Sequence, residues 1–245
     1  QTCALPISML QISKNENLLH DFYFGDWSES LLEDISEVII SPGIAESESI
    51  VRWIRAKNIS IISDIELFGR YVKAPMIGIT GSNGKSTVTQ LLGEMALASS
   101  LKAYICGNIG NPVMECISDD AELYIVELSS YQLDYTNKLD LFAGVITNIS
   151  PDHLDRYSSY SNYISSKLSI YDYSMFNIIN LNEPEVNGIS GDNFFSIEKN
   201  ESKCDFFASK KDNLYEVFHQ GKVLMTSDDL LVVGKHNIEN MLASL

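Results

Sequence analysis

The 245-residue sequence contains no run of about 18 apolar residues, the minimum for a helix that crosses a bilayer. Its N-terminus lacks the charged-then-apolar order of a secretory signal. Cysteine is scarce, and Cys3, Cys106, Cys116 and Cys204 form no CxxC pair and have no histidine at zinc-finger spacing. These absences predict a cytoplasmic protein without membrane insertion, a disulfide framework or a structural zinc site.

Basic residues are also few. The chain has 17 Lys and Arg against 33 Asp and Glu, which gives a formal charge of −16, and its positive residues do not cluster. Such a chain repels a polyphosphate backbone, so we expect no nucleic-acid partner. Any phosphate site must therefore be local.

The two ends are unusual for a complete chain. Residue 1 is Gln rather than Met, and the C-terminal MLASL stops inside an apolar helical pattern. We therefore expect a fragment, in which residues 1–12 match no recognisable pattern.

The first 64 residues have α/β character. Residues 35–40 form an apolar run that ends at Ser41-Pro42-Gly43, which is typical of a strand followed by a turn. Residues 50–54 have helical spacing, and residues 59–62 predict a return strand. Strand, helix and strand form a parallel crossover unit. The glycine turn that opens a Rossmann sheet is missing, so we expect an incomplete Rossmann-like domain over residues 1–64.

Residues 65–245 predict a second domain with a mostly parallel sheet flanked by helices, of the P-loop type. Strands are expected at 76–80, 103–106, 123–126 and 141–146, and a helix from Thr87 to about Ala98 with Val88, Leu91, Leu92 and Met95 facing inward. Residues 190–233 instead show short alternating runs around Gln220-Gly221, which predict a small appended β-hairpin region.

The segment APMIGITGSNGKSTVT predicts a nucleoside-triphosphate site. Gly81 and Gly84 would let the loop approach a phosphate, and the N–H groups at the start of the next helix would face the anion. Lys85 supplies a positive charge and Ser86 a hydroxyl for Mg²⁺. The general P-loop pattern has a further glycine where this chain has Ile79, so a simple glycine turn stays an alternative.

Two further polar residues follow apolar strands. Glu127 comes after LYIV, where an acidic side chain commonly holds Mg²⁺, although a solvated Glu at a strand end is the alternative. His153 follows the next strand and is expected at the same sheet edge, close to metal-bound water or phosphate, unless it is structural.

Lys167 lies on an apolar helix face. It shares the spacing of Tyr160, Tyr163, Ile164 and Tyr171. A lysine in this position ordinarily extends to water. Burial would instead favour its neutral amine, which reacts with CO₂ to form an anionic carbamate that could hold a second Mg²⁺.

Taken in order, the motifs resemble the Mur ligase family. They are GITGSNGKSTVT, GNIGNP, VELSSYQLD, NISPDHLDRY, SSKLSIY and GKHNIENMLAS, with SPGI and SDIELF before them. The similarity runs from about Asp26 to Leu245 and is greatest to the members that add D-glutamate to UDP-N-acetylmuramoyl-L-alanine. The stretch ELSSYQL discriminates best, because sister ligases and folylpolyglutamate synthetase share the loop but differ there.

The resemblance implies a monomeric cytoplasmic ligase of peptidoglycan synthesis that uses ATP, two Mg²⁺ ions and a carbamylated Lys167. It further implies that the C-terminal D-glutamate-binding domain is absent, so that this chain alone is inactive. The implied ATP-binding residues are Gly81, Ser82, Asn83, Gly84, Lys85, Ser86, Thr87, Asn237 and Asn240.

The implied substrate-binding residues are Ser41, Pro42, Gly43, Asn108, Ser129, Gln132 and His153. The implied catalytic residues are Lys85, Glu127, His153 and Lys167, and the implied metal-binding residues are Ser86, Glu127, His153 and Lys167. Another Mur ligase, a folylpolyglutamate synthetase-like ligase, a simple P-loop phosphatase or kinase, and an inactive ATP-binding fragment stay open as alternatives.

Overall fold

The structure is a computed structural model that describes residues 26–152, 156–198, 201–230 and 234–245. His153, which the sequence predicts to be catalytic, lies outside the described residues. In the described part of the chain, no helix is both long enough and apolar enough to cross a membrane.

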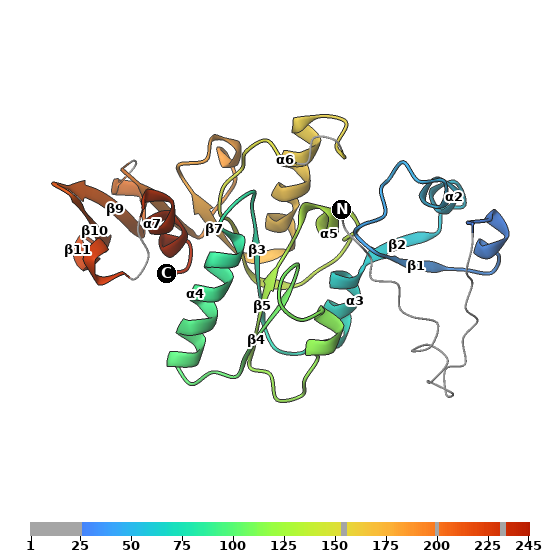
Figure 1. The fold of residues 1–245 in the computed structure, drawn as a ribbon, viewed down its shortest axis with the longest axis horizontal. Helices are drawn as coiled ribbons and strands as arrows, with labels where there is room; N and C mark the ends of the chain where they lie inside the picture. The colour runs from blue at the N-terminus through green and yellow to red at the C-terminus, as the bar shows by residue number, and fades with distance from the viewer. Residues whose placement is uncertain (1–25, 153–155, 199–200, 231–233) are drawn as a thin grey trace.

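The described strands form two sheets (Figure 1). The small sheet pairs β1 (Glu37–Ile40) with β2 (Ser60–Ser63) in parallel. The large sheet has nine strands in the order β11-β10-β9-β8-β7-β6-β3-β5-β4. Its strands are β3 (Met76–Thr80), β4 (Ala103–Gly107), β5 (Leu123–Glu127), β6 (Leu141–Ile146), β7 (Ser174–Asn180), β8 (Asn193–Ile197), β9 (Phe206–Lys211), β10 (Leu214–His219) and β11 (Lys222–Thr226).

The large sheet is parallel from β4 to β9, and only β10 and β11 run antiparallel to their neighbours. The predicted α/β fold with a parallel sheet is thereby confirmed, as is the hairpin around Gln220-Gly221. The hairpin continues the large sheet through β9. Figure 1 shows β9–β11 at one end of the molecule and β1, β2 and α2 at the other.

Helices cover both faces of the large sheet. The α-helices are α2 (Ser49–Ala56), α3 (Asp64–Tyr71), α4 (Lys85–Ala98), α5 (Ser130–Asp134), α6 (Tyr160–Leu168) and α7 (Lys235–Leu242). The 3-10 helices are η1 (Glu29–Leu32), η2 (Val113–Cys116), η3 (Ser169–Tyr173), η4 (Pro184–Val186), η5 (Glu201–Lys203) and η6 (Ser227–Asp229).

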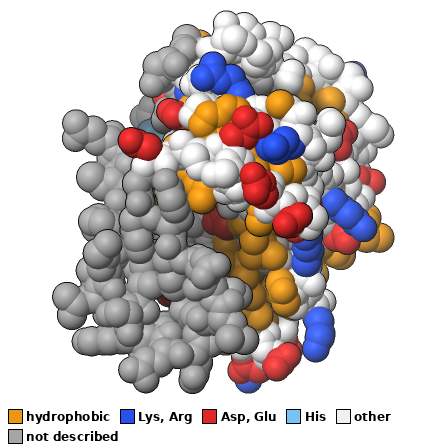
Figure 2. Space-filling model, turned by 90° about the vertical axis from the view of Figure 1, so that its right-hand side faces the viewer, with side chains coloured by type: hydrophobic (Ala, Val, Ile, Leu, Met, Phe, Trp, Pro, Cys, Tyr) orange, Lys and Arg blue, Asp and Glu red, His pale blue; other side chains and the backbone are white. Residues whose placement is uncertain are grey.

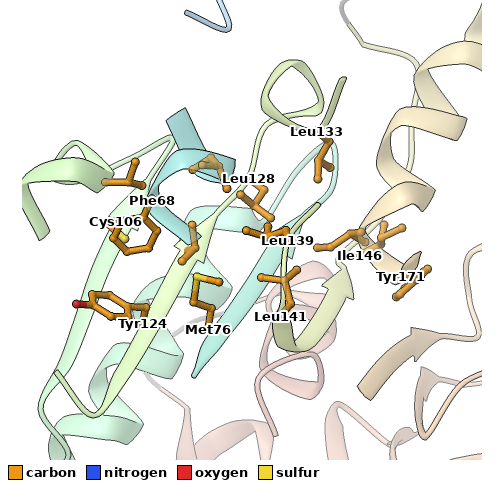
Figure 3. Packing of buried hydrophobic residues seen from close by; sticks show 14 of the residues in the cluster. Phe68, Met76, Cys106, Tyr124, Leu128, Leu133, Leu139, Leu141, Ile146 and Tyr171 are labelled. Atoms are coloured by element: carbon orange, nitrogen blue, oxygen red, sulfur yellow. The ribbon is translucent and has the colours of Figure 1, made fainter. Parts of the chain in front are cut away.

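Strand alternation divides the core between the two faces. On β5, Tyr124 and Val126 join one apolar cluster with Phe68 of α3, while Ile125 joins a second cluster with Val88 of α4. Figure 3 shows the first cluster, in which side chains of α3 and of the sheet strands pack together. Each fully buried aliphatic or aromatic side chain contributes about 1.5–3 kcal/mol. Because both faces are covered, polar ligands can be gathered only at the strand ends.

Three details of the predicted helices were wrong. Helix α4 begins at Lys85, two residues before the predicted start, and Met95 is 40% exposed rather than inward. Ala96 is buried instead, so the inward stripe continues from Val88 in steps of four. Tyr171, predicted on the helix face of Lys167, lies beyond the end of α6 in η3, although it is buried.

Candidate active site

The loop from Gly81 to Lys85 joins β3 to α4 and leaves the N-terminus of α4 facing outward. Gly81 has φ +147° and Gly84 has φ +82°, which are conformations that residues with a side chain rarely adopt. A Cβ atom at Gly81 would collide with Thr147 Oγ1, and one at Gly84 would collide with Asn240 Oδ1. The two glycines are therefore required by the packing of the loop as well as by its backbone.

The end of the neighbouring strand β6 holds this loop in place. Thr147 Oγ1 donates to Asn83 O over 2.6 Å, and Asn148 Nδ2 donates to the same oxygen over 2.8 Å. The Asn83 N–H in turn donates to Asn148 Oδ1 over 2.9 Å. The phosphate loop is thus ordered by direct bonds to the segment that follows β6.

The hydroxyl of Ser82 is occupied within the protein. It is hydrogen-bonded to Tyr163 Oη over 2.8 Å and to Ser150 O and Ser150 N over 2.9 Å each. Ser82, predicted to bind ATP, is therefore held as a structural member of the loop through its side chain.

Lys85 and Lys167 converge on one carbonyl oxygen. Lys85 Nζ donates to Gly81 O over 2.8 Å and to Ser82 O over 3.0 Å, and Lys167 Nζ donates to Gly81 O over 2.8 Å. Because both nitrogens bond to one oxygen, they lie within about 6 Å of each other, a separation at which like charges disfavour ionisation.

The environment of Lys167 lowers its proton affinity. The residue is 2% exposed, and its nitrogen lies 4.7 Å from the centre of the Tyr163 ring. Burial, together with the nearby charge of Lys85, lowers the pKa of the Lys167 ammonium to about 7. Burial lowers the pKa of Lys85 as well, opposed by attraction to Glu127. About half of the Lys167 side chains are therefore in the free amine form at pH 7.

Glu127 is the last residue of β5 and is only 1% exposed. Its carboxylate accepts hydrogen bonds of 2.9 Å from Ser86 Oγ and from Asn108 Nδ2. Two oxygens bound side by side to one octahedral Mg²⁺ lie about 2.9 Å apart, so the Ser86 and Glu127 oxygens have a spacing that suits this ion.

Lys167 in its unmodified form offers no oxygen to a metal ion. No group of three His, Cys, Asp or Glu side chains that could hold a metal ion occurs in the part of the chain that the structure describes. Mg²⁺ sites commonly use one or two protein carboxylates and complete their coordination with phosphate and water. The residues present thus fit one Mg²⁺ at Ser86 and Glu127, and a second only if Lys167 acquires an anionic group.

Two of the predicted substrate-binding residues form the start of α5. Ser129 Oγ accepts from the Gln132 N–H over 3.2 Å, and Gln132 Oε1 accepts from the Ser129 N–H over 3.0 Å, which is a capping box. Gln132 Nε2 also approaches Asp64 Oδ1 at 3.4 Å. These side chains therefore fix the chain direction immediately after Glu127.

Ser41, Pro42 and Gly43 lie in a turn after β1, closed by a 3.0 Å bond from Ile44 N to Ser41 O. Ser41 and Gly43 are exposed on it. The Arg156 guanidinium donates to the carbonyl oxygens of Pro42 and Ile44. The turn is thereby tied to the segment that follows β6.

At the far side of the loop, helix α7 brings Asn240 against Gly84. Asn240 is 6% exposed, whereas Asn237 is half-buried. Next to them, Glu239 Oε1 accepts from Asn180 Nδ2, which also donates to Thr147 O. Helix α7 is thus joined through Glu239 to the strand end that supports the glycine loop.

Comparison with known proteins places this geometry in a family. The family model for the Mur ligase middle domain matches residues 79–245, from β3 through α7. The chain belongs to the Mur ligase family. The family resemblance inferred from the sequence motifs is therefore confirmed.

Individual Mur ligases show how much of such a protein the chain represents. The UDP-N-acetylmuramoylalanine–D-glutamate ligase of Coxiella burnetii (strain Dugway 5J108-111) is 39% identical over 222 residues, covering 90% of this chain and 50% of the relative. The enzyme of the same name from Buchnera aphidicola subsp. Acyrthosiphon pisum (strain Tuc7) is 38% identical over 242 residues, covering 98% and 54%. The chain therefore spans about half the length of these curated relatives.

Solved structures support the Mur ligase fold. A UDP-N-acetylmuramoyl-L-alanyl-D-glutamate–2,6-diaminopimelate ligase superimposes with a TM-score of 0.62 at 16% identity, covering 85% of this chain and 55% of that one. At this level of identity the similarity concerns the fold alone.

Within this Mur ligase chain, the structure brings together most residues that the sequence singled out. Lys85 and Lys167 meet at Gly81, and Ser86 and Asn108 each donate to the Glu127 carboxylate. Thr87 is half-buried in the first turn of α4.

Sequence reasoning missed four residues that build the site: Thr147, Asn148, Tyr163 as a hydrogen-bonding group, and Arg156. Thr147 and Asn148 could have been identified from the sequence, because they directly follow β6, the strand that pairs with β3. Arg156 and the Tyr163 hydroxyl contact partners more than 80 positions away, which no local pattern shows.

Proposed function

We propose that the chain carries the ATP-binding and carboxylate-activating part of a ligase that joins D-glutamate to UDP-N-acetylmuramoyl-L-alanine in peptidoglycan synthesis. The observation that carries this proposal is the meeting of Lys85, Lys167, Ser86 and Glu127 around the N-terminus of α4. The assignment of D-glutamate as the added amino acid is supported by the Coxiella burnetii relative, which is 39% identical and is named UDP-N-acetylmuramoylalanine–D-glutamate ligase.

The proposed reaction has two steps. The substrate carboxylate attacks the γ-phosphorus of ATP, forming an acyl phosphate and releasing ADP. The neutral amine of D-glutamate then attacks the acyl carbon, and the amide forms as phosphate leaves with the electrons of the broken C–O bond and the nitrogen loses one proton to solvent. A carboxylate alone is a poor electrophile, and phosphorylation supplies a good leaving group.

The residues of the chain would assist by position and charge. The N–H groups at the start of α4 would face the phosphates, and Lys85 would leave the carbonyls of Gly81 and Ser82 to reach the β and γ phosphates. Ser86 and Glu127 would hold Mg²⁺, which when bound supplies charge neutralisation between two anions. His153 stays a sequence prediction for the same edge.

We further propose that Lys167 is carbamylated. Its neutral amine would attack CO₂, forming an N–C bond and releasing one proton. The product is an anion beside Lys85, so the charge repulsion between two ammonium groups would become an attraction. The carbamate oxygens would then hold a second Mg²⁺, which the unmodified amine cannot do.

The two sheets support the proposed division of the chain. Residues 1–64 would belong to a domain for the UDP portion of the substrate, and residues 65–245 would form the ATP domain. Ser41, Pro42, Gly43 and Asn108 would face the nucleotide sugar, Ser129 and Gln132 its muramoyl-alanine end, and Asn237 and Asn240 the adenine. A cytoplasmic location and a monomeric state stay predictions.

Phosphate release tests the proposal. The chain would be assayed alone and as a hybrid in which the remaining segments come from the Coxiella burnetii relative. We expect the hybrid to release phosphate from ATP only when both UDP-N-acetylmuramoyl-L-alanine and D-glutamate are present. Because the amino-acid-binding segment comes from the relative, the test of this chain is its nucleotide-sugar substrate. Release that requires a folate substrate, or a UDP-N-acetylmuramoyl acceptor other than the L-alanine form, would assign a different ligase, and ATP binding without release in any mixture would leave only a nucleotide-binding module.

A further inference from the structure

Arg156 lies where segments from both sheets meet. Its guanidinium donates to Pro42 O and, over 2.8 Å, to Ile44 O in the turn after β1. The same group lies 3.9 Å from the centre of the Tyr131 ring on α5, which begins just after Glu127. One side chain therefore joins the small sheet, the large sheet and the helix beside the buried carboxylate.

A second side chain of the large-sheet unit binds the same turn. Tyr135 Oη donates to Ile44 O over 3.0 Å, so Ile44 O accepts from both Tyr135 and Arg156. The carbonyl oxygens of Pro42 and Ile44 thus point toward side chains of residues 65–245, while Ser41 and Gly43 remain exposed. The bonds fix which side of the turn is presented outward.

Gly43 is not required by the fold. Its φ is not in the left-handed region, and a Cβ there would meet only Ser41 Oγ, at an ordinary 3.7 Å. This contrasts with Gly81 and Gly84, where a side chain would collide. Because Gly43 has no side chain, it leaves open space on the exposed side of the turn, although the fold would accept a side chain there.

Arginine suits this junction for a physical reason. A planar guanidinium can donate to two carbonyl oxygens in its own plane while its flat face stacks on an aromatic ring, whereas an ammonium has no flat face to stack. Arg156 also lines a polar cavity of about 380 Å³ with Glu46, Ser47 and Asn162. The segment directly after the turn, residues 45–47, therefore lines this cavity together with residues of the large-sheet unit.

We propose that Arg156 is a positioning residue for the nucleotide-sugar substrate. It holds the Ser41–Ile44 turn against the catalytic edge, so that affinity for UDP-N-acetylmuramoyl-L-alanine depends on it and affinity for ATP does not. This inference rests on the proposed function for the identity of the substrate, whereas the ordering of the turn is a property of the free protein.

The test compares Arg156→Lys with Arg55→Lys in the hybrid ligase described above, in which the segments that this chain does not cover come from the Coxiella burnetii relative. Arg55 is a matched control, because it binds the same segment only through an exposed ion pair with Glu46 at 2.7 Å. Calorimetric titration would measure the dissociation constants for UDP-N-acetylmuramoyl-L-alanine and for ATP with Mg²⁺. Hydrogen exchange would follow the Ile44 and Glu48 amides, which donate to Ser41 O and Ala45 O in the free protein.

For Arg156→Lys we expect at least tenfold weaker binding of the UDP substrate, ATP affinity within twofold of wild type, and at least tenfold faster exchange of both amides. Arg55→Lys should change none of these quantities. Equal weakening of both ligands would indicate a general structural role and overturn the proposal, as would unchanged exchange in Arg156→Lys.

The two proposals fail in different ways. If the hybrid with the wild-type sequence of this chain does not bind the UDP substrate while Arg156→Lys still frees the turn, the substrate assignment is contradicted and the ordering by Arg156 stands. If the wild type binds the UDP substrate and Arg156→Lys binds it equally well, the positioning role is contradicted while the proposed function stands.

Discussion

The pKa of Lys167 leads to a direct prediction about carbamate formation. With a pKa of about 7, roughly three quarters of the Lys167 amine is neutral at pH 7.5, against roughly one thousandth for a lysine with the ordinary value of 10.5. Only the neutral amine reacts with CO₂. The structure therefore predicts a reactive fraction that is several hundred times that of an exposed lysine.

The assay is ¹³C NMR of the protein in ¹³C-labelled bicarbonate at pH 7.5. We expect one protein carbamate signal that disappears in Lys167→Met and remains in Lys102→Met. Lys102 is a suitable control because it is exposed and its ion pair with Asp120 raises its pKa. A carbamate signal that persists in Lys167→Met, or no signal in the wild type, would refute the reasoning.

The same group predicts a pH dependence of stability, measured without CO₂. The folded pKa of Lys167 lies below its unfolded value, so the unfolded chain binds more protons between about pH 7 and pH 10.5. Across that window the free energy of unfolding of the wild type should rise relative to that of Lys167→Met, by up to about 5 kcal/mol for the full shift. Urea denaturation at several pH values measures this difference, and a difference that does not change with pH would contradict the assigned pKa.

Three substitutions test other parts of the site. Glu127→Gln removes the buried carboxylate beside Ser86, so calorimetry should show that Mg²⁺ no longer strengthens ATP binding; an unchanged Mg²⁺ effect would contradict its role as a ligand. Gly84→Ala introduces a collision with Asn240 and a strained φ, and thermal unfolding should show a loss of about 1–3 kcal/mol, whereas Gly43→Ala should lose less than about 0.5 kcal/mol. Equal losses at the two glycines would contradict the packing described. Lys85→Met should weaken ATP binding at least tenfold in titration, and unchanged affinity would exclude its contact with phosphate.

Local patterns predicted the elements of the fold well, and the physical reason is plain. Strand β3 was predicted at its observed bounds because its apolar run ends at the glycine loop. The parallel orientation of the strands also follows from the alternation of strands and helices, which brings Glu127 and the glycine loop to one edge. Met95 was misplaced because helical spacing fits more than one stripe, and the sheet surface decides which stripe is buried.

The contacts within the site were less predictable. Lys167 is buried rather than extended to water, and its nitrogen donates to Gly81 O, which lies 86 positions earlier in the chain. Lys85 donates to the same oxygen. The pairing of Asn108 with Glu127 and the bonds from Arg156 to the turn after β1 arise in the same way. Sequence spacing places such residues at an edge, but only tertiary packing pairs their atoms.

The central claim is that this site activates a carboxylate by phosphorylation. The most direct measurement uses UDP-N-acetylmuramoyl-L-alanine labelled with ¹⁸O in its carboxylate, incubated with the hybrid ligase, ATP, Mg²⁺ and D-glutamate. If an acyl phosphate forms, mass spectrometry of the released phosphate will show one ¹⁸O atom transferred from the substrate. Phosphate released without ¹⁸O during product formation would contradict the account.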